Sequence, residues 1–181
     1  MSDEAKPDRR RWIFGGAGLA ALGAGAWLAT LGREPGPAAT AAAADGLWAR
    51  SFETPAGPTL AMASLRGKPL LINFWATWCA PCVREMPAID RFYRDHAGKG
   101  VQVLGLAIDA PTPVREFLQK VKVGFPIGLA GLEGTELVRE LGNERGGLPF
   151  SLLLDANGKV VQRKLGETSY DELALWAGAL G

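Results

Sequence analysis

Residues 70–82 read LLINFWATWCAPC, a nearly continuous apolar run that leads into two cysteines. A run of this kind is typical of a central strand that is covered on both faces of its sheet. A helix is expected from about Cys79 to His96, which places Cys79 at the helix start and Cys82 one turn further in. The stretch therefore predicts a buried strand, a turn, and a helix that begins with the cysteine pair.

Strands and helices alternate along the rest of the domain. We expect strands at 47–52, 59–63, 70–75, 101–108, 125–129, 150–154 and 159–163, and helices at 79–96, 112–122, 134–141 and after Ser169. Alternation implies parallel strands joined by crossover helices, and Asn157-Gly158 predicts a final antiparallel hairpin. The sequence thus predicts an α/β fold: a mixed central β-sheet flanked by helices on both faces, with an N-terminal β-hairpin from the first two strands.

Composition excludes several functions. The chain has 181 residues, with 20 basic and 19 acidic side chains, so its net charge of +1 gives no electrostatic footprint for nucleic acid. Two cysteines and one histidine fall short of the four ligands of a structural zinc site, and no metal site is expected. The alternative to a reactive pair is a disulfide that only stabilises the fold. Closing so short a loop, however, removes little entropy from the unfolded chain. Reversible oxidation is the remaining use of the pair.

The N-terminal segment 12–32 carries no charge and follows Arg9, Arg10 and Arg11. About 20 apolar residues span a bilayer core, and basic residues tend to stay on the cytoplasmic side. We divide the chain into a cytoplasmic basic N-terminus (1–11), a transmembrane anchor or signal segment (12–32), a linker (33–46) and a folded domain (47–181). A cleaved signal peptide, including a twin-arginine export signal, remains the alternative to an anchor.

The helix start should make Cys79 reactive. Unpaired backbone N–H groups and the positive end of the helix dipole favour thiolate over thiol, and only the thiolate attacks disulfides. Cys79 is therefore the expected attacking residue and Cys82 the resolving one. Ala80 and Pro81 between them carry no charge, so we expect a more reducing pair than one with an intervening histidine.

Residues 73–82, NFWATWCAPC, resemble the active-site strand and turn of the thioredoxin superfamily. The resemblance is strongest to its membrane-anchored TlpA/ResA-type thiol–disulfide oxidoreductases, and it continues through CVREMP at 82–87, GLPF at 147–150 and LDANG at 154–158. It covers roughly residues 47–181. It implies a thioredoxin fold in which 112–141 supplies the central strand–helix insertion of this branch.

The resemblance also assigns candidate site residues. Pro149 matches the family's cis-proline, which would present the Leu148 backbone to a bound substrate chain as a short added strand; a trans proline that starts a strand is the alternative. Trp78 matches the tryptophan beside the attacking cysteine and would shield the site. Together with Pro81, Leu148 and Trp78 are the expected substrate contacts.

Glu85 matches a glutamate found three residues after the second cysteine in ResA-type proteins. Helical spacing places it on one face with Cys82, Ile89 and Phe92, where burial would raise its pKa and let it exchange a proton with Cys82. The alternative is a solvated charge paired with a neighbour such as Arg84. Cytoplasmic thioredoxins have a buried aspartate at the position of Asn73, which cannot titrate, so here we expect a local hydrogen bond instead.

The resemblance implies a reductant of disulfides in extracytoplasmic client proteins, for example apocytochrome c in cytochrome c maturation. It implies no cofactor, and it implies a transmembrane thiol–disulfide transporter of DsbD/CcdA type as electron donor. The expected location is the bacterial inner membrane, single-pass, with the domain in the periplasm or on the outer face. Two alternatives stay open: a thiol-dependent peroxidase, and a copper-binding or delivery module of Sco type.

Overall fold

The structure, a computed structural model, describes residues 45–180. Its strands are β1 (Ser51–Glu53), β2 (Thr59–Ala61), β3 (Leu70–Trp75), β4 (Gln102–Ala107), β5 (Ile127–Leu129), β6 (Phe150–Leu154) and β7 (Val160–Leu165). Its helices are α3 (Ala80–His96), α4 (Pro111–Lys120), α5 (Gly134–Glu140) and α6 (Tyr170–Gly178), with 3-10 turns η2 (Met62–Leu65) and η3 (Ala97–Lys99).

The expected anchor or signal segment at 12–32 lies outside the described residues, as does nearly all of the expected linker at 33–46. Between residues 45 and 180, every helix is too short or too polar to cross a membrane. The proposed division of the N-terminal part of the chain therefore stays a prediction.

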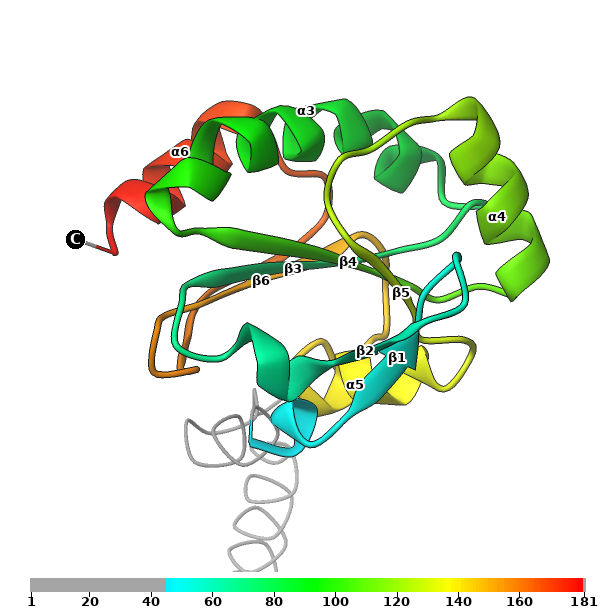
Figure 1. Cartoon of the computed structure of the whole chain (residues 1–181), viewed down its shortest axis with the longest axis horizontal. Coiled ribbons are helices and arrows are strands. Elements are labelled where there is room, and N and C mark those ends of the chain that lie inside the picture. The colour runs from blue at the N-terminus through cyan, green and yellow to red at the C-terminus, as the bar shows by residue number, and fades with distance from the viewer. Residues whose placement is uncertain (1–44, 181) are drawn as a thin grey trace, which may run out of the picture. The chain divides into compact units, whose positions relative to one another are not determined.

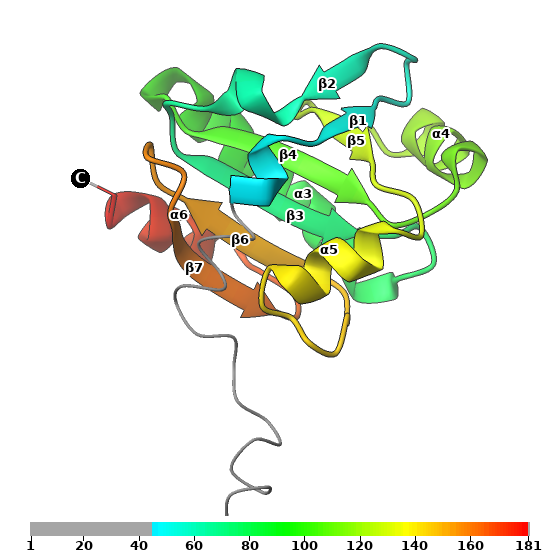
Figure 2. The ribbon, with the colours of Figure 1, turned by 90° about the horizontal axis from the view of Figure 1, so that it is seen from below.

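One mixed sheet contains all seven strands, in the order β2-β1-β5-β4-β3-β6-β7. Strand β3 pairs parallel with β4 and antiparallel with β6, and β6 pairs antiparallel with β7. Helices α3 and α6 cover one face of the sheet, and α5 lies on the other (Figures 1 and 2). The predicted mixed sheet with helices on both faces is confirmed.

Strand β3 is buried on both sides, which explains its unbroken apolar sequence. Leu71 and Trp75 enter the core cluster under α3, whereas Leu70, Ile72 and Phe74 enter the cluster on the α5 side. Successive side chains of a strand point to opposite faces, so a strand that is covered twice needs apolar residues at nearly every position. This burial makes β3 an interior strand of the sheet. The turn that follows it therefore lies at the carboxyl end of β3, between the sheet and the start of α3.

The prediction of a strand across 47–52 is wrong in its first half. Residues 45–48 are helical, and the strand begins only at Ser51. Leu47 and Trp48 are both buried in the cluster on the α5 side, and the Arg66 guanidinium lies 5.1 Å from the Trp48 ring centroid. Two neighbouring side chains that both face one core do not fit the alternation of a strand, so the helical turn forms instead.

Near the C-terminus the predicted β-hairpin and the predicted helix after Ser169 are both confirmed. Asp155 and Lys159 close the β6–β7 hairpin through a backbone bond, and Gly158 takes a φ of 82° at the turn. Ser169 caps α6 by accepting from the Glu172 N–H at 3.3 Å. The Glu172 carboxylate pairs with Lys164.

Gly134 provides a test of how tightly α5 packs on the sheet. An alanine Cβ there would lie 2.8 Å from the Ala130 Cβ and 2.9 Å from the Ile108 Cγ1. We therefore expect Gly134→Ala to lower the free energy of unfolding by about 1–3 kcal/mol, as overpacking does. Urea unfolding measures the change.

Gly178→Ala is the matched control, because no atom lies within 4 Å of the new Cβ and the glycine is also helical. It should stabilise the protein by about 0.5 kcal/mol through a less flexible unfolded chain. Equal effects of the two substitutions would contradict the packing described here.

Candidate active site

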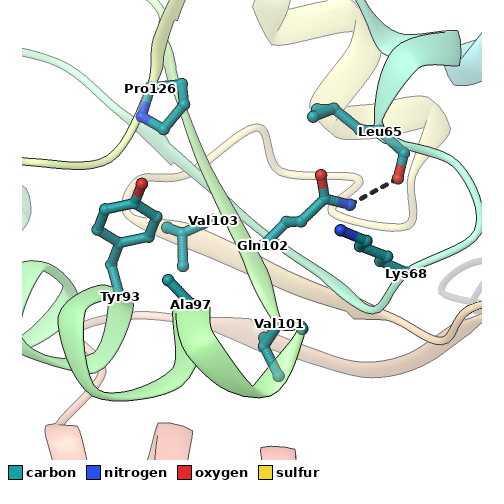
Figure 3. Close-up of a pocket in the computed structure, with 9 residues that line it drawn as sticks. Leu65, Lys68, Tyr93, Ala97, Val101, Gln102, Val103 and Pro126 are labelled. Atoms are coloured by element: carbon teal, nitrogen blue, oxygen red, sulfur yellow. Dashed lines mark hydrogen bonds between the residues drawn. The ribbon is translucent and has the colours of Figure 1, made fainter.

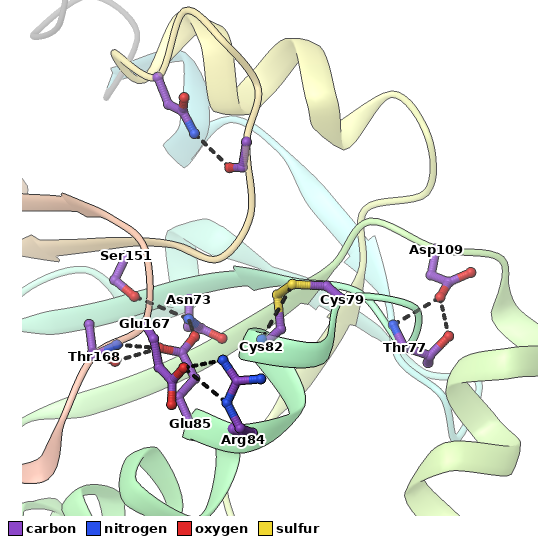
Figure 4. The surroundings of a disulfide bond; sticks show 12 residues. Asn73, Thr77, Cys79, Cys82, Arg84, Glu85, Asp109, Ser151, Glu167 and Thr168 are labelled. Carbon is purple, nitrogen blue, oxygen red and sulfur yellow. Dashed lines mark hydrogen bonds and ion pairs between the residues drawn. A yellow bond between two sulfur atoms is a disulfide. The ribbon is translucent and has the colours of Figure 1, made fainter.

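The cysteine pair lies at the start of α3, directly after the turn that follows β3 (Figure 4). Cys79 is the N-cap residue, and its Sγ accepts from the Cys82 backbone N–H at 3.3 Å. The two residues form a disulfide with a Cα–Cα distance of 5.3 Å. Pro81 lies in the first helical turn, where its missing N–H costs no hydrogen bond.

The two cysteines differ in exposure. Cys79 is 6% exposed, whereas Cys82 is fully buried in the core cluster under α3. Backbone N–H groups and the dipole at a helix N-terminus stabilise negative charge on Cys79 when the disulfide is open. The arrangement therefore suits exchange in which a partner sulfur meets Cys79 and Cys82 closes the bond from below.

Asp109 fixes the turn before the cysteines. Its Oδ2 accepts from the Thr77 N–H at 3.0 Å and from the Thr77 hydroxyl at 2.5 Å, and its Oδ1 accepts from the Ala110 N–H at 2.7 Å. Asp109 follows the neighbouring parallel strand β4, and the carboxyl ends of parallel strands meet at one edge of a sheet. Sequence reasoning missed this residue, although an acidic residue after a central strand was a usable signal.

The loop before β6 contains the expected cis bond, between Leu148 and Pro149. Asn143 Nδ2 donates to the Gly147 carbonyl at 2.8 Å, and the Gly166 N–H donates to the Pro149 carbonyl at 2.8 Å. Leu148 packs against the core cluster that contains both cysteines. The structure thus brings this loop beside the disulfide, while the substrate-presenting role of Leu148 and Pro149 stays a prediction.

Glu85 is 1% exposed and accepts three hydrogen bonds. Asn73 Nδ2 donates to Oε1 at 2.8 Å, and the Thr168 N–H and hydroxyl donate to Oε2 at 2.6 and 2.8 Å (Figure 4). The solvated charge paired with Arg84 is not what the structure shows, since Arg84 pairs with Glu167 at 2.7 Å. Glu85 is instead a buried carboxyl group one helical turn beyond Cys82.

Burial raises the pKa of Glu85 above its ordinary value of 4.5. Hydrogen bonds from Thr168 and Asn73 oppose this shift because they favour the charged form, and the nearby charge of Glu167 adds to it. The carboxyl group can therefore hold a proton at a higher pH than an exposed glutamate. Its exchange of a proton with Cys82 remains a prediction.

Asn73 makes the local hydrogen bonds expected of it. It is fully buried, and its Nδ2 also donates to Ser151 Oγ at 3.1 Å. Its Oδ1 has no partner among residues 45–180. Sequence reasoning did not single out Ser151 or Thr168; the only signal was a hydroxyl inside the apolar run 150–154 and another just before the last helix.

The neighbours of Cys79 in the turn are more exposed than Cys79 itself. Trp78, next to Cys79, is 67% exposed, and Pro81 is half-buried. A pocket of about 220 Å³ lies at the opposite end of β4, where Gln102 Nε2 donates to the Leu65 carbonyl and Lys68 and Tyr93 line the wall (Figure 3). Within residues 45–180 no group of three potential metal ligands occurs.

A mixed sheet whose central strand leads into a Cys-x-x-Cys disulfide at a helix N-terminus, with a cis-proline loop beside it, defines a thioredoxin-fold protein with a dithiol site. Residues 37–174 match the family model described as Redoxin, and the chain belongs to the Redoxin family. The expected resemblance to ResA-type proteins is confirmed by the relatives that follow.

The thiol-disulfide oxidoreductase ResA of Bacillus cereus is 34% identical over 118 residues, which is 65% of this chain and 66% of that protein. ResA of Geobacillus kaustophilus is 33% identical over 113 residues, 62% of this chain and 63% of that protein. The chain therefore matches just under two thirds of the length of these relatives.

Solved structures agree with the fold. MTB dsbF is 27% identical with a TM-score of 0.63, covering 75% of this chain and 97% of that one. StoA from Bacillus subtilis is 26% identical with a TM-score of 0.59, covering 71% and 95%. The predicted thioredoxin fold is confirmed.

The buried carboxyl group of Glu85 should make the free energy of unfolding depend on pH. Because Glu85 holds its proton more tightly in the folded than in the unfolded protein, wild-type stability should fall as the pH rises from 4.5 through the higher pKa of the folded state. Glu85→Gln cannot titrate and lacks this loss. The unfolding free energy of the wild type, measured in urea across this range, should therefore decline relative to that of the variant.

Thr168→Val supplies the matched comparison. It removes one hydrogen bond that favours the charged carboxylate, so the pKa of Glu85 should rise further and the loss of stability should extend to higher pH. Parallel pH profiles for the wild type and Glu85→Gln would show that the carboxyl group is not desolvated as described.

Proposed function

We propose that the chain is a thiol–disulfide oxidoreductase that reduces disulfides of client proteins outside the cytoplasm. The observation that supports this most directly is the division between the two sulfurs, with Cys79 at the helix N-terminus and 6% exposed, and Cys82 directly beneath it and fully buried. The ResA relative that is 34% identical is named a thiol-disulfide oxidoreductase, which supports thiol–disulfide exchange as the chemistry of the site.

The reaction moves two electrons from the dithiol to the client. The Cys79 thiolate attacks one sulfur of the client disulfide, forms a mixed disulfide and releases the other client sulfur as a thiolate. The Cys82 thiolate then attacks Cys79 Sγ, which forms the internal disulfide and releases the second client thiolate. The client disulfide is reduced to two thiols, and the Cys79–Cys82 pair is oxidised.

Glu85 takes the proton that Cys82 must lose before it attacks. It lies one turn further along α3, and burial already raises its pKa, so that it can hold this proton and later return it when the disulfide is reduced. Asn73 and Thr168 orient the carboxyl group through three hydrogen bonds. Trp78, Pro81 and Leu148 contact the client chain, and Pro149 holds the Leu148 backbone beside the cysteines.

The proposed location rests on the uncharged segment 12–32 and the three arginines before it. We place the chain in the bacterial inner membrane, single-pass, with the domain in the periplasm or on the outer face. An oxidised dithiol there needs a two-electron donor on the same side, and a transmembrane thiol–disulfide transporter of DsbD/CcdA type supplies it. Clients then include apocytochrome c, whose cysteines must be reduced before haem attachment in cytochrome c maturation.

Cys82→Ser should trap clients as mixed disulfides with Cys79, because the resolving sulfur is missing. Non-reducing gels of cells that express this variant should show thiol-sensitive adducts of higher mass. Cys79→Ser is the matched control and should form none, since buried Cys82 does not meet clients.

The direction of electron transfer is measured on the clients that Cys82→Ser traps. Reduced wild-type protein should convert their disulfides to free thiols, as measured by mass-tagging of new thiols. Absence of adducts with Cys82→Ser, or equal adducts with Cys79→Ser, would contradict the assigned roles.

A further inference from the structure

The loops at one end of the sheet carry an excess of basic side chains. This end lies opposite the cysteines, where β3 and β4 begin and β6 ends, because β3 pairs parallel with β4 and antiparallel with β6. Its three loops, 66–69, 97–101 and 155–159, lie together at the end of the domain away from α4 (Figure 1). We call this surface the basic end, and its exposed cations are Arg66, Lys68, Lys99 and Lys159.

The positive charge of the basic end is not balanced by nearby carboxylates. None of its four cations forms an ion pair within residues 45–180. Asp155 is the only acidic residue in the three loops, and the backbone N–H groups of Asn157 and Lys159 donate to its Oδ1 at 2.9 Å. The loops at the cysteine end have the reverse balance, with one basic residue, Arg145, and four acidic ones, Asp109, Glu133, Glu144 and Glu167.

Two pockets open between the loops of the basic end. The pocket of about 220 Å³ is lined by Lys68 and by Gln102 (Figure 3). A second pocket of about 310 Å³ is lined by Lys99 and His96, and Val101 contributes to both pockets. A lysine therefore stands at the wall of each pocket, so that an anionic group entering either one meets a donor of charge-assisted hydrogen bonds.

The N-terminal part of the chain joins the domain next to the basic end. A Cβ atom at Gly158 would lie 2.7 Å from Trp48 Nε1, and the Arg66 guanidinium lies 5.1 Å from the Trp48 ring centroid. Only residues 33–44 separate the described domain from the uncharged segment 12–32, and a chain of that length reaches at most about 40 Å. A bilayer that holds this segment therefore lies within reach of the basic end.

We propose that the basic end docks on the headgroups of anionic phospholipids in the membrane that anchors the chain. The inference rests on the membrane location proposed above. Each Lys or Arg close to an anionic bilayer surface contributes about fivefold to binding, and the attraction fades within a Debye length of about 10 Å. Docking turns the carboxyl end of β3, and with it Cys79, away from the bilayer and toward soluble clients.

The docked state is reversible because it depends on charge. All large apolar side chains that are exposed between residues 45 and 180 lie outside the three loops, so none is placed to insert into the bilayer. Release of the domain lets Cys79 turn back toward the membrane, where the proposed electron donor lies. Docking thus favours the encounter with clients over the encounter with the donor.

The test uses the oxidised full chain, reconstituted in vesicles of phosphatidylcholine alone or mixed with phosphatidylglycerol. The Cys79–Cys82 disulfide does not react with maleimides, so the cysteine of Asn157→Cys in the β6–β7 turn carries the only fluorophore. Lipids with a quencher on the headgroup report its distance from the bilayer. Quenching should be stronger with phosphatidylglycerol and should fall in concentrated salt, whereas Glu144→Cys at the cysteine end should show no such gain.

Two double variants, each in the Asn157→Cys background, test which charges are responsible. Lys68→Gln with Lys99→Gln should lower the ratio of docked to free domain about 25-fold, because it removes two contributions of about fivefold each. Lys120→Gln with Arg145→Gln is the matched control, since it removes the same charge from exposed positions outside the basic end. It should keep the ratio of the parent protein.

The outcomes separate this inference from the proposed function. Equal quenching of Asn157→Cys in both kinds of vesicle, or an equal loss in the two double variants, would overturn the docking. If the chain does not float with phosphatidylcholine vesicles, the anchor prediction is wrong and the inference falls with it. Reduction of client disulfides is tested independently through the adducts of Cys82→Ser and does not depend on either result.

Discussion

The hydrogen bond from the Cys82 N–H to the Cys79 sulfur is the interaction on which the site depends. It exists because α3 begins at the residue after Cys79, so that its free N–H groups and its dipole point at that sulfur. Burial of β3 on both faces fixes where this helix can begin, and Asp109 holds the intervening turn through Thr77. A shift of the helix start by one residue would remove the bond.

A buried polar network lies beneath the disulfide. Asn73 and Thr168 donate hydrogen bonds to Glu85 there, and burial of the carboxyl group raises the pKa of Glu85. On the solvent side, Trp78 next to Cys79 is 67% exposed, whereas Cys79 itself is 6% exposed. An exposed apolar side chain beside Cys79 suits contact with a protein partner, and a buried titratable group one turn beyond Cys82 suits transfer of that cysteine's proton.

Much of this arrangement could be predicted from the sequence because its signals are local. The apolar run at 70–75 and the helical spacing from Cys82 to Glu85 specified a covered strand, a helix start and a buried carboxylate. Asp109 and Thr168 could not be found in this way, because they bond to residues 32 and 83 positions away and meet them only in the folded chain. The helical turn at 45–48 was missed because adjacent apolar residues also occur in strands that are covered on both faces. Only the structure shows that Leu47 and Trp48 enter the same core cluster.

The most direct test of the central claim is the reactivity of Cys79 in the reduced protein. Alkylation by iodoacetamide is measured from pH 5 to 10 in Cys82→Ser, where Cys79 is the only thiol. Stabilisation by the start of α3 predicts a half-maximal rate well below pH ~8.5, the midpoint of an ordinary cysteine. A midpoint at or above that value would show that the helix start does not stabilise the thiolate, and would contradict the account.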